Sequence, residues 1–539
     1  MSDQDQAVSG NNQQELIKQL QKTIDELRLD NASLRATLDK LQKMLFAPHS
    51  EKKRTKDFPG QMSLFNEAES EADPSAKEPP VSTLVEGYAR KKGRSPKSRY
   101  EEIFSSLPVE KVYCSVADED RVCPRCGSEM IHLGEEVVRE ELKIIPAEVK
   151  RIQYVQETVI CDTCKKNDMG IITKAQVPSP LFQHSYASPS TVAHIMYQKY
   201  VMSNPLYRQE KDWEQMGVQI SRATMANWII KAGQDYIQPV FEAMHRHLIE
   251  RGFINGDETP CQVLHEEGRR PQQKSYMWLY CTGEDGLPPI ALYEYQPSRG
   301  GYNANAFLKG FDGFFTCDGY QGYNVLKKVT RCACWAHIRR YWFDALPGKK
   351  GTSDRSPELS EIGLDYCNKL FDIEAELKDL SPDDRKAGRL EKERPILDAF
   401  WKWLEGLTPA KGTRLARAVK YTWDQKPYAE NYLLDGRCSI SNNLAENCAR
   451  PYVIGRKNFL FHDTVNGANA SAAIYSLIET AKRNRLNVYR YLNTVLLYMP
   501  DYINEPDGIE ELMPWSEMIR STCGMPERGT ERLTSNKQE

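Results

Sequence analysis

No apolar run in this chain of 539 residues reaches the roughly 20 residues that a membrane-spanning helix needs, and its polar start, MSDQDQAVSG, is not a signal peptide. We therefore expect a cytoplasmic protein with no membrane contact. A large excess of one charge is also missing. The net charge is −3, so any nucleic-acid binding must come from local basic patches.

A disulfide framework is not indicated either. Of the 14 cysteines, four stand in two C-x-x-C pairs and the rest are scattered, which favours a reducing compartment with one metal site. The chain is too long for a single core, and roughly three or four domains are expected.

Residues 1–50 contain a heptad pattern in LIKQLQKTIDELRLDNASLRATLDKLQKML. Leucine fills every d position, and the a positions are apolar except at Asn31. This is typical of a parallel coiled coil in which one polar residue fixes the register, so we expect at least a homodimer. The alternative is an amphipathic helix packed on its own globular domain.

Residues 51–108 are expected to form a linker with a basic arm. FNEAESEADPSAKEPP is acidic and poor in large apolar residues, whereas RKKGRSPKSR contains no acidic residue. Such an arm can lie along DNA phosphates or simply be solvated. Its candidate DNA contacts are Arg90, Lys91, Lys92 and Arg94.

Residues 109–180 hold the cysteine pairs. The pairs are Cys123 with Cys126 and Cys161 with Cys164. Four thiolates in two such knuckles suit one structural Zn²⁺, and the pattern disfavours redox use, which is the competing idea. EVVREELKII and KRIQYVQETVI between the pairs are expected to be strands, so we predict a zinc-ribbon DNA-binding domain.

Residues 181–250 are expected to be helical. PLYRQEKDWEQMGVQISRATMANWIIKAGQ predicts a helix, a turn at Gly217, an N-cap at Ser221 and a second helix through Trp228. This spacing is similar to a helix-turn-helix, with Arg222 as a candidate DNA contact. Helix pairs of this kind are also common in ordinary protein cores.

Residues 251–346 change to a strand pattern. FINGDETPCQVL, SYMWLYCTGE and PIALYEYQPSRGG predict three strands, NANAFLKGF a helix, GFFTCDGYQGYN a fourth strand, and RCACWAHIRRYWFDAL a strand running into a helix. This is the order of a ribonuclease-H-like sheet. It places Asp257 on the first strand beside Asp318 at the end of the fourth, and Gly319 and Gly322 would let a DNA backbone approach.

Residues 436–500 complete this catalytic domain and offer a third carboxylate. Glu446 in SISNNLAENCARPYVIGRKNFLF is either a metal ligand or part of a capping box with Asn443 as N-cap, and the helix is expected to break at Pro451. The candidate phosphate contacts around the site are His337, Arg340, Arg450, Arg456 and Lys457. Cys332 and Cys334 are interpreted as buried core thiols.

Residues 347–435 are expected to be a helical insertion. LDYCNKLFDIEAELKDL, ILDAFWKWLEGL and RLARAVKYTWDQKPYAENYLLDG predict its helices, and Leu415, Val419 and Trp423 share one face of the last. The insertion either shapes DNA binding or is structural. Residues 501–539 are expected to form a polar tail.

Six sequence blocks in the same order resemble the transposases of the insertion sequence 66 family. They are GDETPCQVL, PSRGGYNANAFLKGF, CDGYQGYN, CWAHIRR, NNLAENCARPYVIGRKNFLF and AAIYSLIETAKRN. Asn447 stands where an arginine is expected in the family. The resemblance implies a DDE-type DNA transposase of a bacterial mobile element, associated with the nucleoid, with Asp257, Asp318 and Glu446 at the matching positions.

The chemistry that the resemblance implies is phosphodiester cleavage and strand transfer. Three carboxylates can hold two Mg²⁺ or Mn²⁺ ions about 4 Å apart across one phosphodiester. The implied partners are double-stranded DNA, as inverted repeats and target, and accessory proteins from the same element. The fold class expected is multidomain α+β. A metal-dependent nuclease without strand transfer and a sequence-specific DNA-binding regulator are the alternatives.

Overall fold

The computed structural model describes residues 125, 128, 148–160, 172–347, 358–503 and 505–525. Several predicted features lie outside these residues, namely the coiled coil, the basic arm with Arg90, Lys91, Lys92 and Arg94, and the zinc cysteines Cys123, Cys126, Cys161 and Cys164. The described residues from Val155 to Gly524 belong to one structural unit. No helix among the described residues is long and apolar enough to cross a membrane.

A short antiparallel hairpin begins the unit. β1 (Thr158–Ile160) pairs with β2 (Ile172–Lys174), and Thr158 lies opposite Lys174. The strand predicted over KRIQYVQETVI is therefore wrong for residues 150–157, which have no strand pairing. Their side chains are exposed, Val155 by 91%. Alternating apolar residues do not form a strand when no neighbouring backbone is available to pair with them.

Helices follow up to residue 249. They are α5 (Pro189–Tyr200), α6 (Leu206–Gln215), α7 (Arg222–Ala232), the π-helical η2 (Gly233–Ile237) and α8 (Gln238–Ile249). The predicted helix pair is confirmed. Gly217 has a positive φ of 80°, and the Ser221 hydroxyl accepts a hydrogen bond from the Thr224 N–H at 3.1 Å. At Gly233 a side chain would collide with Ala470, so the glycine permits close helix packing.

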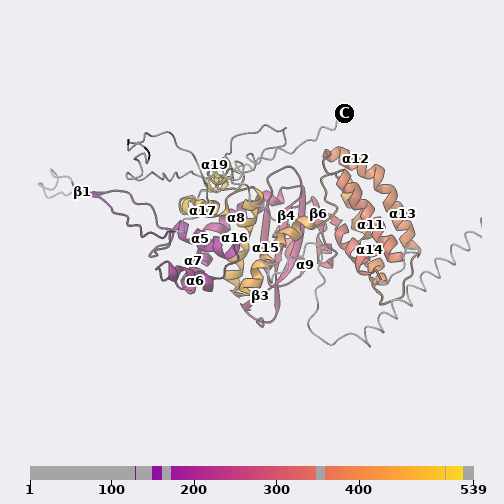
Figure 1. Cartoon of the computed structure of the whole chain (residues 1–539), viewed down its shortest axis with the longest axis horizontal. Coiled ribbons are helices and arrows are strands. Elements are labelled where there is room, and N and C mark those ends of the chain that lie inside the picture. The colour runs from indigo at the N-terminus through magenta and orange to yellow at the C-terminus, as the bar shows by residue number, and fades with distance from the viewer. Residues whose placement is uncertain are drawn as a thin grey trace, which may run out of the picture. The chain divides into compact units, whose positions relative to one another are not determined.

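The central sheet is mixed and has the strand order that the sequence predicts (Figure 1). Its strands are β3 (Phe253–His265), β4 (Lys274–Thr282), β5 (Ala291–Gln296), β6 (Phe314–Cys317) and β7 (Thr330–Ala333). Their order is β5-β4-β3-β6-β7, antiparallel among the first three and parallel from β3 to β7. A strand missed in the sequence, β8 (His462–Thr464), pairs in parallel with the far end of β3.

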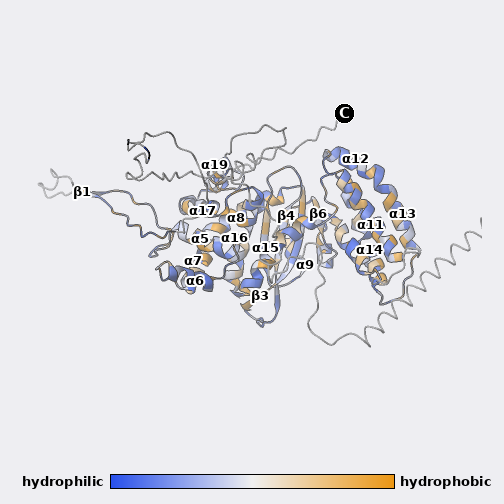
Figure 2. Ribbon diagram, viewed as in Figure 1, coloured by the Kyte–Doolittle hydropathy of each residue, from blue (hydrophilic) through white to orange (hydrophobic). Residues whose placement is uncertain are grey.

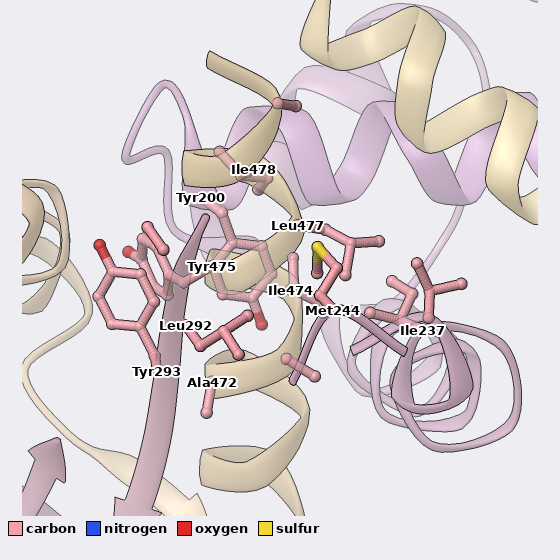
Figure 3. Packing of buried hydrophobic residues seen from close by; sticks show 14 of the residues in the cluster. Tyr200, Ile237, Met244, Leu292, Tyr293, Ala472, Ile474, Tyr475, Leu477 and Ile478 are labelled. Atoms are coloured by element: carbon pink, nitrogen blue, oxygen red, sulfur yellow. The ribbon is translucent and has the colours of Figure 1, made fainter. Parts of the chain in front are cut away.

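Helix α16 (Val465–Arg483) protects the edge strand β5. It is buried on all sides from Ala470 to Ala481, as expected of a core helix. The Thr480 hydroxyl accepts from the Ala291 N–H at 3.0 Å, and the Ser476 hydroxyl accepts from the Tyr293 N–H at 2.8 Å. These hydroxyls satisfy backbone groups that an edge strand otherwise leaves unpaired. Figure 3 shows Ile474, Tyr475 and Leu477 of α16 packed among residues of β5 and α8.

Within residues 358–434 the insertion forms four helices, whose hydrophobic cluster also includes residues of β7 and of the helix at residues 335–344. They are α11 (Leu359–Glu376), α12 (Pro382–Lys392), α13 (Arg394–Glu405) and α14 (Arg414–Ala429), followed by the 3₁₀ turn η4 (Asn431–Leu434). The shared face of α14 is confirmed, since Leu415, Val419 and Trp423 all pack in this cluster. The sequence pattern missed α12, which is hydrophilic along most of its length (Figure 2).

The last described segment is not only a polar tail. After α17 (Val488–Tyr502), the chain forms α18 (Pro506–Glu511) and α19 (Glu517–Cys523). Leu512, Met513 and Ile519 are fully buried. The expectation of a polar tail is therefore wrong for residues 505–524, because a few apolar residues among charged ones are sufficient to attach these helices to the core.

Candidate active site

Asp257 lies in the middle of the sheet, on β3. The antiparallel registers place Asp257, Leu279 of β4 and Tyr293 of β5 in one cross-strand row, so their side chains share one face. Tyr293 donates a hydrogen bond from its hydroxyl to the carbonyl of Cys448 in α15 (Asn443–Phe459). Helix α15 therefore covers the face of the sheet that carries Asp257 (Figure 1).

Asp318 follows the last residue of β6. The parallel register pairs Asn255 of β3 with Thr316 of β6, and continuing it by two residues sets Asp257 opposite Asp318. The Asp318 carboxylate accepts from the Tyr320 N–H at 2.9 Å, and the Asp318 carbonyl accepts from Arg331 at 2.7 Å. The strand thus ends on a carboxylate that both starts a turn and stands beside a second carboxylate.

Glu446 lies in the first turn of α15. The capping-box interpretation is wrong, because the N-cap is Asn442 rather than Asn443 and its side chain caps no helix N–H. The fully buried Asn442 side chain instead donates to the Gly256 carbonyl at 2.9 Å and accepts from Asn255 at 3.2 Å. These bonds attach the helix start to β3 next to Asp257.

The helix does not break at Pro451, as the sequence had suggested. α15 continues through Pro451 to Phe459, so Arg450, Arg456 and Lys457 all lie on the helix that carries Glu446. Arg456 donates to the Thr259 hydroxyl at 3.2 Å, two residues along β3 from Asp257. Arg450 and Lys457 are exposed.

The three carboxylates interact electrostatically. The pKa of Asp257 is raised to about 7, mainly by burial, and the neighbouring charges of Glu258, Asp318 and Glu446 contribute in the same direction. Burial of a carboxylate and repulsion between acids both disfavour the ionised form. A divalent cation with oxygen ligands would remove this repulsion, so the donor set fits Mg²⁺ or Mn²⁺.

Glu446 has a carboxylate oxygen that is available to bind a metal ion. Its Oε1 atom is buried and has no hydrogen-bond partner among the described residues. His337 of α10 (Trp335–Asp344) lies next to it, with its Nδ1 atom 3.7 Å away. The sequence placed His337 among the phosphate contacts; the structure places it against the third carboxylate. Arg340 of the same helix is exposed.

A fourth carboxylate, Glu258, was missed in the sequence. It belongs to the opposite face of the sheet, in a row with Trp278 and Glu294. Arg299 donates to Glu258 at 2.6 Å, and its guanidinium lies 3.9 Å from the centre of the Tyr320 ring. Arg299 therefore connects Glu258 to the loop after Asp318. The one sequence signal that predicts opposite orientations for Glu258 and Asp257 is the alternation of side chains along the strand.

The space beside the two glycines after Asp318 is filled by other side chains of the protein. A Cβ atom on Gly319 would lie 2.5 Å from the ring of Tyr421 in the insertion, and one on Gly322 would meet Tyr320. Close packing of aromatic rings therefore explains these glycines without an approaching DNA backbone. Arg222 lies elsewhere, exposed at the start of α7, and the structure does not bring it to the carboxylates.

Comparison with known proteins identifies the class. A family model described as "Transposase IS66 family" matches residues 184–470, more than half of the chain, and covers the sheet with Asp257 and Asp318 and the helix with Glu446. The protein is therefore an enzyme of the DDE transposase class. It belongs to the IS66 family of transposases.

Three further family models match the flanking regions. "Transposase C of IS166 homeodomain" matches residues 33–112, "zinc-finger binding domain of transposase IS66" matches residues 120–165, and "IS66 C-terminal element" matches residues 476–515. The second of these includes all four cysteines of the C-x-x-C pairs. The third includes α18.

Two bacterial relatives resemble most of the chain. The uncharacterized protein y4hP of Sinorhizobium fredii is 27% identical over 435 residues, which are 76% of this chain and 77% of that protein. The uncharacterized protein y4jD of the same organism is 26% identical over 416 residues, 74% of this chain and 79% of that protein. Their names state no activity.

Proposed function

We propose that the protein binds the terminal inverted repeats of its element and performs two-metal cleavage and strand transfer, with Asp257, Asp318 and Glu446 as the metal ligands. The observation that carries this proposal is the register of β3 and β6 together with the Asn442 attachment of α15, which bring the three carboxylates to one region of a ribonuclease-H-like core.

In this proposal, different residues of the chain bind the metal ions and the DNA phosphates. The three carboxylates would hold two Mg²⁺ or Mn²⁺ ions, which activate the attacking oxygen and stabilise the leaving oxygen when bound. Arg450, Arg456 and Lys457 are basic residues on the same helix as Glu446 and are suited to hold the DNA phosphates near it. No protein nucleophile is required.

The other regions would bind DNA and assemble the enzyme. One Zn²⁺ on Cys123, Cys126, Cys161 and Cys164 would order a DNA-binding ribbon, and the basic arm and the α6–α7 pair with Arg222 would add contacts. The N-terminal heptads would form the dimer. Accessory proteins of the same element would complete the complex.

The test incubates the full chain and Mg²⁺ with labelled duplex carrying the inverted repeats that flank its gene. We expect Asp257→Asn, Asp318→Asn and Glu446→Gln to abolish cleavage while DNA binding persists. Asp312→Asn, an exposed acid just before β6, is the matched control and should cleave normally. Cleavage retained by any of the three variants would remove that residue from the proposed centre.

The products separate the alternatives. Joined strands identify a transposase, and cleavage without joining would identify a nuclease of the same fold. DNA binding without cleavage, even with the accessory proteins added, would indicate that the protein is a DNA-binding regulator.

A further inference from the structure

Glu446 forms a cluster with two further side chains, to which the proposed reaction assigns no joint role. Cys334 is the residue between β7 and α10, His337 lies in the first turn of α10, and Glu446 lies in the first turn of α15. One ligand atom from each lies within 4.8 Å of the others. In the part of the chain that the structure describes, no other group of three such side chains is arranged in this way.

Backbone contacts fix the two helix starts against each other. The Trp335 N–H donates to the Ile440 carbonyl at 3.0 Å, and the Asn442 N–H donates to the Cys334 sulfur at 3.1 Å. Cys334 and His337 are three residues apart at a helix start, so they face the same side. The cluster is therefore held in place by the fold and does not depend on a chance meeting of long side chains.

Two atoms of the cluster are buried and lack hydrogen-bond partners among the described residues. They are Nδ1 of His337 and Oε1 of Glu446, which face each other at 3.7 Å. This separation is too long for a hydrogen bond. It is close to the spacing of two ligands on one tetrahedral zinc ion, about 3.3 to 3.8 Å for Zn–ligand distances of about 2.0 to 2.3 Å.

We propose that Cys334, His337 and Glu446 form an additional metal site that binds a thiophilic divalent cation of the zinc class and shares Glu446 with the Mg²⁺ centre. A sulfur, an imidazole nitrogen and a carboxylate oxygen together select zinc, cobalt or iron, whereas Mg²⁺ prefers oxygen ligands alone. Water or a phosphate oxygen would take the fourth position. The sharing of Glu446, which rests on the proposed function, makes the two occupancies compete.

Cobalt is the probe for binding. Full-length protein whose cysteine knuckles are already loaded with Zn²⁺ is titrated with Co²⁺, and the near-ultraviolet absorption that cobalt–thiolate bonds produce is recorded. We expect this signal in the wild type and its loss in Cys334→Ser, with a fall in Co²⁺ affinity of at least about tenfold in His337→Asn. Cys332→Ser, a buried cysteine two residues earlier, is the matched control and should keep the signal.

A signal that is unchanged in Cys334→Ser would come from the knuckles and would overturn the site. His337→Asn changes a partly exposed side chain, so it still tests the site if Cys334→Ser does not fold. Equilibrium dialysis should give one more Zn²⁺ per chain in the wild type than in Cys334→Ser, and equal numbers would likewise overturn it.

Competition is tested in the Mg²⁺-dependent cleavage assay. Each protein is compared with its own zinc-free rate, and the Zn²⁺ concentration that halves this rate should rise at least about tenfold in Cys334→Ser. Equal inhibition of both proteins would disprove the sharing of Glu446. An absence of cleavage in Mg²⁺ alone would count against the proposed function, and the cobalt and dialysis results would still decide the site.

Discussion

The side-chain amide of Asn442 donates a 2.9 Å hydrogen bond to the carbonyl oxygen of Gly256, the residue before Asp257. The same side chain accepts from Asn255, and its backbone N–H donates to Cys334. One buried asparagine thus connects β3, the start of α10 and the start of α15. These are the elements that carry Asp257, His337 and Glu446.

Asn442→Ala is expected to reduce both cleavage and folding stability. The loss of the two side-chain bonds leaves buried polar groups unpaired, at a cost of about 1–3 kcal/mol in the free energy of unfolding. A shift of Glu446 by about 1 Å is expected to lower the cleavage rate by about 100-fold. Urea unfolding and Mg²⁺-dependent cleavage measure the two effects. The control is Asn443→Ala at the exposed neighbouring residue, which should change neither the cleavage rate nor the unfolding free energy. Equal cleavage rates in Asn442→Ala and Asn443→Ala would refute the positioning role of Asn442.

Gly319→Ala is expected to impair cleavage through Tyr421. The new methyl group would lie 2.5 Å from the Tyr421 ring, which stacks on Tyr341 at a centroid distance of 4.1 Å, so either the ring or the turn after Asp318 must move. We expect at least a tenfold loss, roughly 1.4 kcal/mol in the activation free energy. In a Tyr421→Ala background the same change should have little further effect. Additive losses in the double mutant would show that the two residues act separately.

Ser476→Ala is expected to destabilise the core by about 1–3 kcal/mol, because the Tyr293 N–H of the edge strand loses its acceptor in a buried position. Thr480→Val removes the hydroxyl that serves Ala291 and should have a similar cost. Urea unfolding measures both. The exposed Ser521→Ala should remain near wild-type stability, and a wild-type midpoint for Ser476→Ala would mean that water replaces the hydroxyl.

Glu294→Gln is expected to stabilise the protein at alkaline pH. Burial raises the pKa of Glu294 from 4.5 to about 7 in the folded chain, so its contribution to stability is present below pH 4.5 and is lost as the pH rises through 7. Glutamine cannot ionise, so the variant should gain up to about 3 kcal/mol at pH 8 and less than about 1 kcal/mol at pH 5. Thermal unfolding at both pH values is the measurement. Exposed Glu284→Gln is the control, and a gain that is the same at both pH values would contradict the ionisation argument.

Local patterns in the sequence predicted the elements of the core correctly, including the helix pair around Gly217 and the strand order with Asp257 on the first strand and Asp318 after the fourth. They failed where stability comes from partners far along the chain. Helix α12 has almost no apolar face of its own, yet its buried Arg389 donates to Glu374 of α11 and to carbonyls near η4. Pro451 was expected to end α15, but the helix continues because its packing on β3 and β4 outweighs one missing hydrogen bond.

By itself, the sequence determined most strands and helices of the core and the position of Asp318 directly after a strand, because hydrophobic periodicity and turn residues act over short distances. The tertiary structure alone decided that Asn442 attaches Glu446 to β3, that Arg299 binds Glu258, and that Cys334 and His337 meet Glu446. These contacts join residues up to 187 positions apart, and only the packing of the sheet against α10 and α15 brings such residues together.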